Sequence, residues 1–436
     1  MEGSRARLPQ RHGGLRASPE RPDTGKLDVV RNYDAIVIGA GPAGSTAARL
    51  LARDGASVLL LDKHRFPRDK PCGGGVTLRA ASVQDIDLSP VVERTIYGAR
   101  FSLRLGRAFD RRHREPLAYM TQRRRLDQFL AERAAESGAD LHDGQAVRDI
   151  DVAAAFKPAQ EGGVVTIRAN SDTYTSRILI GADGANGLCG QALGLRRDYE
   201  EAVALEGNVQ FSPDIPEDWR ECVALDIGGL AGGYGWVFPK GDHLNVGVGA
   251  WKYAGFTLRP KLAELCERYG FDAGALTNVR GHHLPLRVPG SPIARGPVAL
   301  AGDAAGLVDP LTGEGIHMAF ASGRQAAEQA LRVLAGEAPD MSGYQRRLDR
   351  TLQPELTVSR KLQELFNFAP PPYVAAMRRS EKFWLFFCHI LRGEMTYLDF
   401  IHMIGPMRVA VDFFAGVAER HRLSRVRALS PLLRGR

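Results

Sequence analysis

Apolar runs and a glycine-rich turn alternate near the start of the chain. Residues 35–38 are all apolar and predict a buried strand, and the stretch GAGPAG follows them directly. Residues 45–53 then carry the spacing of a helix, and residues 58–61 form a second apolar run that ends at Asp62. The pattern predicts a strand, a tight turn, a helix and a second parallel strand.

Two later apolar runs also precede an acidic residue. Residues 178–180 come before Asp183, and residues 298–300 come before Asp303. After the second run, a Pro-Leu-Thr-Gly turn leads into a helix predicted from about residue 313 to residue 334. Both runs therefore predict strands that are followed by an acidic side chain at their carboxyl ends.

The middle of the chain has the texture of an antiparallel sheet. In the stretch YGWVFPKGDHLNVGVGA, three aromatic residues alternate, a turn follows at 239–242, and residues 244–249 return. On the return strand, Gly247 and Gly249 remove side chains and leave room for something flat or long. Two interpretations stay open here, an aromatic core face of the sheet or an apolar wall of a substrate site.

The first glycine turn has the chemistry of a dinucleotide site. GxGxxG lies between a strand and a helix, and an acid follows about 20 residues on, which is the fingerprint in its proper context. The glycines allow the backbone to approach a pyrophosphate at the helix N-terminus, and Asp62 accepts hydrogen bonds from a ribose. The second strand end favours FAD over NAD, because Asp303 suits a ribityl hydroxyl and the following helix N-terminus suits the flavin edge.

Composition and charge exclude several classes. The chain has 436 residues, of which 44% are apolar, so it can bury a large core and divides into two or three structural parts. Residues 1–31 carry a net charge of +3 and residues 418–436 carry +5, which accounts for the whole net charge of +8. No basic groove is implied, so no nucleic-acid partner is expected. The five scattered cysteines contain no CxxC pair, which argues against a disulfide framework or a thiolate metal site and favours the cytoplasm.

The two basic tails differ in character. The N-terminal tail, residues 1–31, is rich in Pro, Gly and Arg and is predicted to be disordered. The C-terminal tail places Leu423, Val426 and Leu429 among arginines, which suits a peripheral contact with anionic lipid on the cytoplasmic membrane face. The uncharged run at residues 383–391 has nine residues, too few to span a bilayer.

Three motifs in order indicate a known flavoprotein architecture. GAGPAG, GADG and GDAAG resemble the glutathione-reductase-type FAD fold as the para-hydroxybenzoate hydroxylase group uses it. The resemblance implies an α/β (α+β) protein, with a Rossmann-type FAD-binding domain, an antiparallel-sheet substrate domain and a C-terminal helical region. It also implies that Arg123, chosen over Arg124 and Arg125, begins a helix that contacts FAD, and that the backbone of Val147 meets the adenine. The expected parts are the tail at 1–31, an FAD-binding domain from 32–85, 115–195 and 284–340, a substrate domain from 86–114 and 196–283, and a helical region at 341–436.

A second set of motifs is more specific. CGGG at Cys72 to Gly75, YxWxFP at Tyr234 to Pro239 and GDAAGLVDPLTGEGI together look like the geranylgeranyl reductase family. The resemblance implies an FAD-dependent oxidoreductase that saturates C=C bonds of an isoprenoid or prenyl-lipid substrate in lipid metabolism. Within the family, the chain is similar to the bacterial and archaeal prenyl-lipid and prenylquinone reductases. Only one dinucleotide-binding unit is present, so NAD(P)H or a ferredoxin-type donor would deliver electrons transiently. The oligomeric state stays open.

The candidate site residues fall into two sets. The catalytic candidates are Cys72, Tyr234 and Trp236. Alkene reduction needs a proton beside the hydride, and the Cys72 thiol is a candidate donor or positioner, or simply a small buried residue. Arg68 and Lys70 are candidates for a substrate phosphate. The cofactor-binding candidates are Gly39, Gly41, Ala43, Gly44, Asp62, Lys63, Cys72, Gly73, Gly75, Arg123, Val147, Asp183, Asp303, Gly313, Gly315 and Ile316.

Two other functions remain open for this sequence. The stretch YGWVFP is similar to the WxWxIP stretch of flavin halogenases, so an FAD-dependent monooxygenase or halogenase is the alternative. In this chain Tyr234 replaces the first Trp and Phe238 replaces the Ile, and CGGG is not part of that pattern. A non-catalytic prenyl-lipid carrier that keeps FAD as structure is the third hypothesis.

Overall fold

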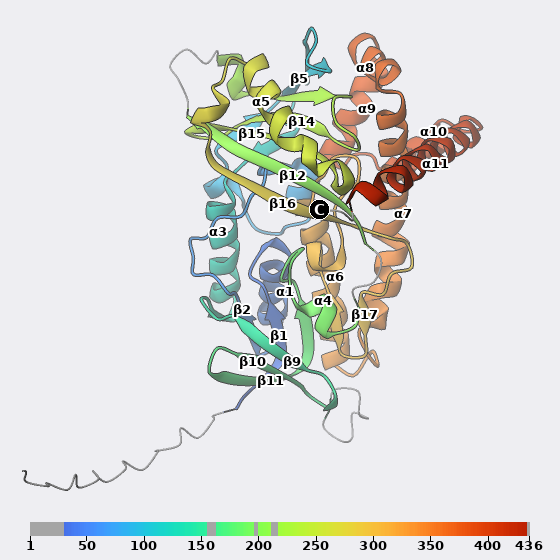
Figure 1. Ribbon diagram of the computed structural model, residues 1–436. Coiled ribbons are helices and arrows are strands. Elements are labelled where there is room, and N and C mark those ends of the chain that lie inside the picture. The colour runs from blue at the N-terminus through green and yellow to red at the C-terminus, as the bar shows by residue number, and fades with distance from the viewer. Residues whose placement is uncertain (1–29, 155–162, 196–198, 211–216, 434–436) are drawn as a thin grey trace, which may run out of the picture.

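A mostly parallel sheet forms the lower lobe of the molecule (Figure 1). The computed structural model describes residues 30–154, 163–195, 199–210 and 217–433, so nearly all of the N-terminal tail predicted to be disordered lies outside the described residues. The strand order is β17-β18-β11-β1-β2-β8, with β10 and β9 added beside β11. The strands are β1 (Arg31–Ile38), β2 (Val58–Leu61), β8 (Asp140–His142), β9 (Val147–Asp151), β10 (Val165–Ala169), β11 (Asp172–Gly181), β17 (Ala294–Arg295) and β18 (Val298–Leu300).

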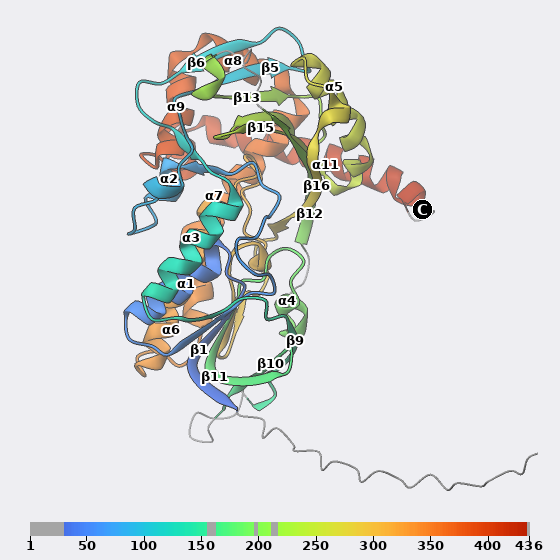
Figure 2. The same cartoon turned by 90° about the vertical axis from the view of Figure 1, so that its left-hand side faces the viewer.

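Three helices cover one face of this sheet. α1 (Pro42–Arg53) packs against both α3 (Arg123–Glu136) and α6 (Ile316–Leu334), and Figure 2 shows the three side by side. The last four residues of β1 and all four of β2 are buried, as expected for parallel strands covered on both faces. The glycine turn between β1 and α1 therefore opens at the carboxyl edge of the sheet, where such folds bind ligands.

An antiparallel sheet forms the upper lobe. Its order is β16-β12-β15-β14-β13-β5-β6, and only the β13–β5 pair is parallel among the described strands. α5 (Leu258–Arg268) packs on it, through the cluster that includes Leu262 and Leu265. The strands are β5 (Gly98–Leu103), β6 (Phe109–Arg112), β12 (Tyr199–Gln210), β13 (Cys222–Ile227), β14 (Tyr234–Pro239), β15 (His243–Trp251) and β16 (Thr277–Arg287).

Short elements join the two lobes. β3 (Gly75–Thr77), β7 (Ala118–Met120) and β4 (Arg94–Ile96) form a small third sheet. The remaining short elements are α2 (Leu78–Ala81), α4 (Cys189–Ala192), η1 (Ser89–Val91), η4 (Glu217–Arg220), η5 (Lys252–Thr257), η6 (Ala273–Ala275) and η7 (Gly302–Ala305). The third sheet places the strand that begins at Gly75 beside both lobes.

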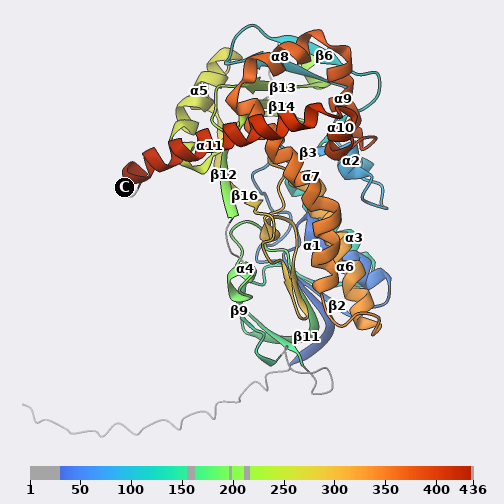
Figure 3. The ribbon, with the colours of Figure 1, turned by 90° about the vertical axis from the view of Figure 1, so that its right-hand side faces the viewer.

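The C-terminal helices cover one side of both lobes (Figure 3). α7 (Ser342–Phe368) packs against α6 below and against α8 (Pro370–Arg379) above. α9 (Glu381–Arg392) and α10 (Tyr397–Met403) follow, and α11 (Met407–Leu433) crosses the molecule. The apolar run at 383–391 lies in α9, where Trp384 and Cys388 pack against Phe101 of the antiparallel sheet.

The sequence-based fold class is confirmed. The predicted strands at 58–61 and 298–300 match β2 and β18, and the predicted hairpin corresponds to β14 and β15. α6 begins at Ile316, later than predicted, because Asp309 accepts the Leu311 and Thr312 N–H groups and holds the preceding residues in a turn. None of the helices in the described ranges is long and apolar enough to cross a membrane. The domain boundaries stay a prediction.

Candidate functional site

A single cavity of about 770 Å³ extends from the glycine turn of β1–α1 to the helices above the antiparallel sheet. Its lining includes every residue predicted for the site except Gly44. Gly44 stands behind the turn, where a Cβ would overlap the carbonyl oxygen of Gly39, so its lack of a side chain serves packing. The cavity thus joins residues that lie more than 200 positions apart in the chain.

The glycine turn presents an open helix N-terminus to the cavity. Gly41 caps α1 without any side-chain cap, and no acidic residue lies in the first turn of this helix. A Cβ at Gly41 would lie 3.5 Å from Arg68 Nη2 and 3.9 Å from Arg123 Nη2. Two guanidinium groups and a helix N-terminus therefore face the same point, which suits a diphosphate.

A network of charges fixes these two arginines. Arg123 makes two hydrogen bonds of 2.7 Å to Asp127, and Arg68 lies 2.8 Å from Asp127 and 3.3 Å from Asp62. Arg124 and Arg125 are exposed, so Arg123 is the arginine that reaches the cavity. Arg68, which the sequence suggests as a candidate for a substrate phosphate, also lines this end of the cavity.

Asp62 and Val147 lie at the end that the adenosine would occupy. The Asp62 carboxylate accepts hydrogen bonds from the backbone N–H groups of Ala40 and His64, both at 2.9 Å. The Gln145 N–H donates to the Asp62 carbonyl at 2.8 Å, which brings the start of β9, at Val147, beside it. Lys63 is exposed at the rim of the cavity.

The Asp183 carboxylate turns toward its own loop. Asp183 lines the cavity, but its Oδ2 accepts the Cys189 N–H at 2.9 Å, at the start of α4. A Cβ at Gly187 would overlap the same carboxylate. Asp183 therefore shapes the loop through its Oδ2, whereas its buried Oδ1 has no partner among the described residues.

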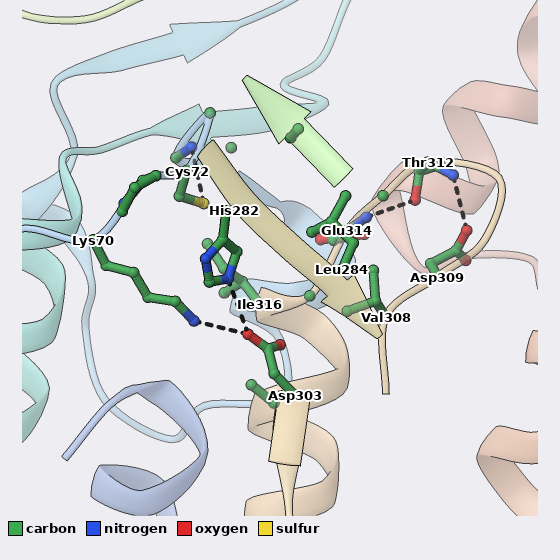
Figure 4. Close-up of a pocket in the computed structure, with 18 of the residues that line it drawn as sticks. Lys70, Cys72, His282, Leu284, Asp303, Val308, Asp309, Thr312, Glu314 and Ile316 are labelled. Atoms are coloured by element: carbon green, nitrogen blue, oxygen red, sulfur yellow. Dashed lines mark hydrogen bonds and ion pairs between the residues drawn. The ribbon is translucent and has the colours of Figure 1, made fainter. Parts of the chain in front are cut away.

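Asp303 is held by Lys70 and His282 at the centre of the cavity (Figure 4). Lys70 Nζ lies 2.7 Å from its Oδ2, and His282 Nε2 lies 3.7 Å from the same oxygen. Burial opposes the charged form, yet Lys70 and His282 outweigh it and hold the pKa of Asp303 well below its usual range. An ionised carboxylate at this position can accept hydrogen bonds from hydroxyl groups. Lys70 is thus engaged with Asp303 and is not directed to open solvent.

The turn before α6 forms the opposite wall. Gly313 has a φ of +70°, which favours glycine, and Gly315 caps α6 without a side-chain cap. A Cβ at Gly315 would lie 3.2 Å from Asp303 Oδ1. Together with Ile316, these residues leave a second open helix N-terminus beside Asp303 (Figure 4).

The three glycines after Cys72 have separate structural reasons. A Cβ at Gly73 would lie 2.8 Å from the Phe238 ring. Gly74 has a φ of +64°, and a Cβ there would overlap the Thr121 carbonyl oxygen. Gly75 begins β3 and has ordinary space around it.

A buried lysine holds this glycine loop. Lys240 is 2% exposed and donates to the carbonyls of Gly73 and Thr121, the latter at 3.0 Å. Burial lowers its pKa to about 8, while Cys72 and Glu206 oppose that shift. The role of Lys240 could not be predicted from the sequence, because its partners lie more than 100 residues away.

The aromatic candidates form walls, and their polar groups have partners. The Tyr234 hydroxyl donates to the Thr312 carbonyl, and the Trp236 indole N–H donates to Asn245 Oδ1 at 2.8 Å. A Cβ at Gly247 would overlap the indole, so the room left by that glycine is filled by Trp236. Cys72 differs from these two candidates. Its sulfur accepts a hydrogen bond from the Gly74 N–H at 3.3 Å, and the thiol hydrogen takes no part in that bond.

The far end of the cavity is apolar. Side chains of β5, β13 and the helices α7, α8 and α9 line it. They include Phe101, Val223, Leu225, Ile227, Phe366, Met377, Trp384, Phe387 and Leu391. This region can hold a long hydrocarbon chain away from water.

The polar half of the cavity fits FAD. Its two open helix N-termini, the paired arginines and the ionised Asp303 supply the partners that a diphosphate, a ribityl chain and a flavin edge require. No cluster of ligands suited to a metal ion occurs within the described ranges.

Removing the Asp303 carboxylate is expected to weaken FAD retention. Asp303→Ala would leave buried polar partners unpaired, at about 1–3 kcal/mol, or roughly 5- to 150-fold in Kd. Titration of the apoprotein with FAD measures this Kd. Asp110→Ala, which removes an exposed ion pair with Arg100, is the control. Equal FAD affinity in both variants would remove Asp303 from the cofactor site.

Comparison with known proteins gives the same picture. A family model described as an FAD binding domain matches residues 32–227. A geranylgeranyl diphosphate reductase of Rhodobacter capsulatus is 33% identical, over 70% of this chain and 77% of its own length. A digeranylgeranylglycerophospholipid reductase of Methanopyrus kandleri is 33% identical, over 73% of this chain and 85% of its own.

A solved structure shares the fold. The crystal structure of a geranylgeranyl bacteriochlorophyll reductase-like protein from Thermoplasma acidophilum superimposes with a TM-score of 0.67 at 24% identity. The match covers 83% of this chain and 96% of that one. This match shows the fold, and the sequence relatives above show that the chain belongs to the geranylgeranyl reductase family of FAD-dependent oxidoreductases.

Proposed function

We propose that the protein saturates isolated C=C bonds in the isoprenoid chain of a prenyl lipid or prenyl diphosphate. The observation that carries the proposal is the continuity of one cavity, from the FAD-fitting polar half to the apolar half. The two relatives compared above are named for substrates that share a geranylgeranyl chain and differ in head group. We infer that recognition resides in the hydrocarbon chain.

Bound FAD, once reduced, supplies the hydride for such a reaction. The chain's own residues exclude water and orient the alkene. Trp236 and Phe238 form a flat wall beside Cys72, and Phe101 and Trp384 enclose the apolar end. An isolated alkene carries no polar group near the reacting carbons, so packing alone must select which double bond reaches the polar half.

The electron donor and the catalytic roles belong to this proposal as well. The described residues contain one glycine turn of the GxGxxG type between a strand and a helix, since the glycines before Tyr234 lead into β14. NAD(P)H or a ferredoxin-type protein would then reduce the flavin in a transient encounter. Cys72, at the junction of the two halves, holds the double bond in place or contributes its thiol hydrogen.

An anaerobic assay tests the function. With a chemical reductant and geranylgeranyl diphosphate or a geranylgeranylated lipid, we expect products heavier by two hydrogens per reduced bond, without any need for oxygen. An absolute oxygen requirement would instead indicate the monooxygenase or halogenase alternative. Tight binding of the lipid without turnover would indicate a carrier.

The exposed face of α10 and α11 supports a peripheral membrane contact. Five apolar residues there are each more than half exposed and make up the α10–α11 apolar patch: Met403, Met407, Val409, Phe413 and Phe414. Arg408, Arg420 and Arg425 are exposed on the same helix, which suits anionic lipid. All five residues of the patch lie before the predicted tail at 418–436. Within that tail, Arg422 is instead buried, with its Nε 2.7 Å from Glu364.

Polar substitutions in the patch test this contact without removing Arg422. The double variant Phe413→Ser, Phe414→Ser is expected to lower binding to vesicles containing phosphatidylglycerol at least about tenfold, because burying each aromatic side chain contributes about 1.5–3 kcal/mol. FAD content should not change, and salt should weaken binding of the unmodified protein. Val279→Ser, at an exposed position on β16, is the control. Vesicle binding that is equal in all three proteins would refute the contact.

A further inference from the structure

A buried carboxyl group lies directly beside Cys72. Glu206 on β12 is 8% exposed, lines the cavity, and accepts the Cys72 N–H on its Oε1 at 2.6 Å. The strand register places Glu206 in one row with Trp236, Gly247 and Arg280, across four neighbouring strands. Because Gly247 has no side chain, the indole lies over it and the row presents Glu206 and Trp236 to the cavity together.

We propose that Glu206 is the acid that delivers the proton in alkene reduction. The proposal deepens the function proposed above and rests on it. As a hydride reaches one alkene carbon, the carboxyl O–H bond of Glu206 breaks and a C–H bond forms at the other carbon. The alkene gains two electrons and two hydrogens, and Glu206 is left as a carboxylate that takes a new proton from water.

The other polar groups around this point are engaged. The Tyr234 hydroxyl and the Trp236 N–H donate to protein acceptors, and Lys240 donates to two backbone carbonyls. The remaining acid donors are Glu206, Cys72, Glu314 and His282. Of these, His282 is directed to Asp303, with its Nε2 3.7 Å from the Asp303 Oδ2. Glu314 accepts a hydrogen bond from the Thr77 hydroxyl at 2.8 Å and belongs to the turn before α6, which would hold the flavin edge.

The surroundings of Glu206 suit a group that changes charge during turnover. Burial raises its pKa to about 7, while the Cys72 N–H, Lys240 and Asn245 favour the carboxylate. The proton is therefore held near neutral pH, and its loss leaves an anion that already has partners. The titratable and charged groups that face Glu206 are Cys72, Asp69, Lys240, Arg280 and His282.

A short route leads from Glu206 to solvent. Arg280, its neighbour in the row, pairs with Asp69 at 3.3 Å, and both side chains are about half exposed. Water at this rim of the cavity can return the proton after each turnover. The part of the cavity from which the hydride would come does not need to be reached by water.

The test replaces Glu206 with glutamine, which keeps the size and carries no acidic proton. We expect Glu206→Gln to lower anaerobic alkene reduction by about 10²–10⁴-fold, with unchanged FAD content and unchanged flavin reduction by dithionite. The rate of the unmodified protein should fall as the pH rises through about 7, because Glu206 loses its proton there. This limb of the pH profile should be absent in Glu206→Gln, and the FAD-free variant should lack one protonated-carboxyl band in its infrared spectrum.

Matched variants separate the alternatives. Glu201→Gln, on the same strand and paired with Lys252, should keep both the rate and the pH profile. Cys72→Ser should keep the pH limb and change mainly which bonds are reduced. A normal rate in Glu206→Gln, or a pH limb that disappears only in Cys72→Ser or Glu314→Gln, would overturn the assignment. Absence of any alkene reduction in the unmodified protein would instead overturn the proposed function, and the assignment with it.

Discussion

Alanine at Gly74 is expected to disable the protein, whereas alanine at Gly75 is expected to be tolerated. Gly74 has a φ of +64°, and the left-handed region costs a residue with a Cβ about 1–2 kcal/mol. The added Cβ would also overlap the Thr121 carbonyl oxygen and lie 2.5 Å from Lys240 Nζ. Gly74→Ala should therefore displace the loop that carries Cys72, with loss of retained FAD and of several kcal/mol in the free energy of unfolding.

Gly75 is the matched control one residue away. Its Cβ would meet Met120 Sδ at 3.9 Å, which is ordinary van der Waals contact. Urea unfolding and the FAD-to-protein ratio measure both variants. Equal stability and an equal FAD-to-protein ratio in Gly74→Ala and Gly75→Ala would show that Gly74 is not required for the glycine loop.

Truncation of Trp236 is expected to have the second large effect. Its indole is 8% exposed and fills the space above Gly247, so Trp236→Ala opens a void in the upper sheet. Removal of a buried tryptophan side chain costs about 3–5 kcal/mol of unfolding free energy. The void also removes the flat wall beside Glu206, so alkene reduction should fall below detection even at temperatures where the variant stays folded.

Two comparisons isolate the role of the indole. Trp236→Phe should recover most of the stability, because it keeps a ring over Gly247. Only the hydrogen bond to Asn245 Oδ1 is lost in this variant. Trp219→Ala removes an indole that packs on Tyr269, outside the cavity, and should leave alkene reduction unchanged. Loss of activity in Trp219→Ala equal to that in Trp236→Ala would indicate a general loss of stability.

The local parts of the fold could be predicted from the sequence because their determinants are neighbours in the chain. GAGPAG specifies its own turn, and the apolar runs at 58–61 and 298–300 are continuous because both faces of their sheet are covered. The alternation of Tyr234, Trp236 and Phe238 likewise follows the period of a strand.

The wider site could not be predicted, since its contacts join distant segments. Cys72 and Glu206 are 134 residues apart, and Lys70 and Asp303 are 233 residues apart. Glu206 lies in a stretch that carries no motif, and Lys240 lies in the turn after YxWxFP, where a lysine is ordinary. Only the strand register and the third sheet bring the two to the glycine loop. Arg68 and Lys70 are candidates for a substrate phosphate, and the sequence could not show that they pair with Asp127 and Asp303.

Single-turnover reoxidation of the reduced flavin tests whether the protein passes its electrons to an alkene. The FAD-loaded protein is reduced in the absence of oxygen and mixed with a geranylgeranylated substrate, and flavin absorbance and product mass are followed together. The account predicts that the flavin is reoxidised as the substrate gains two hydrogens, in equal amounts, and that Glu206→Gln slows this step without altering the bound FAD. Flavin that stays reduced until oxygen is admitted, with substrate unchanged in mass or gaining oxygen or halogen, would contradict it.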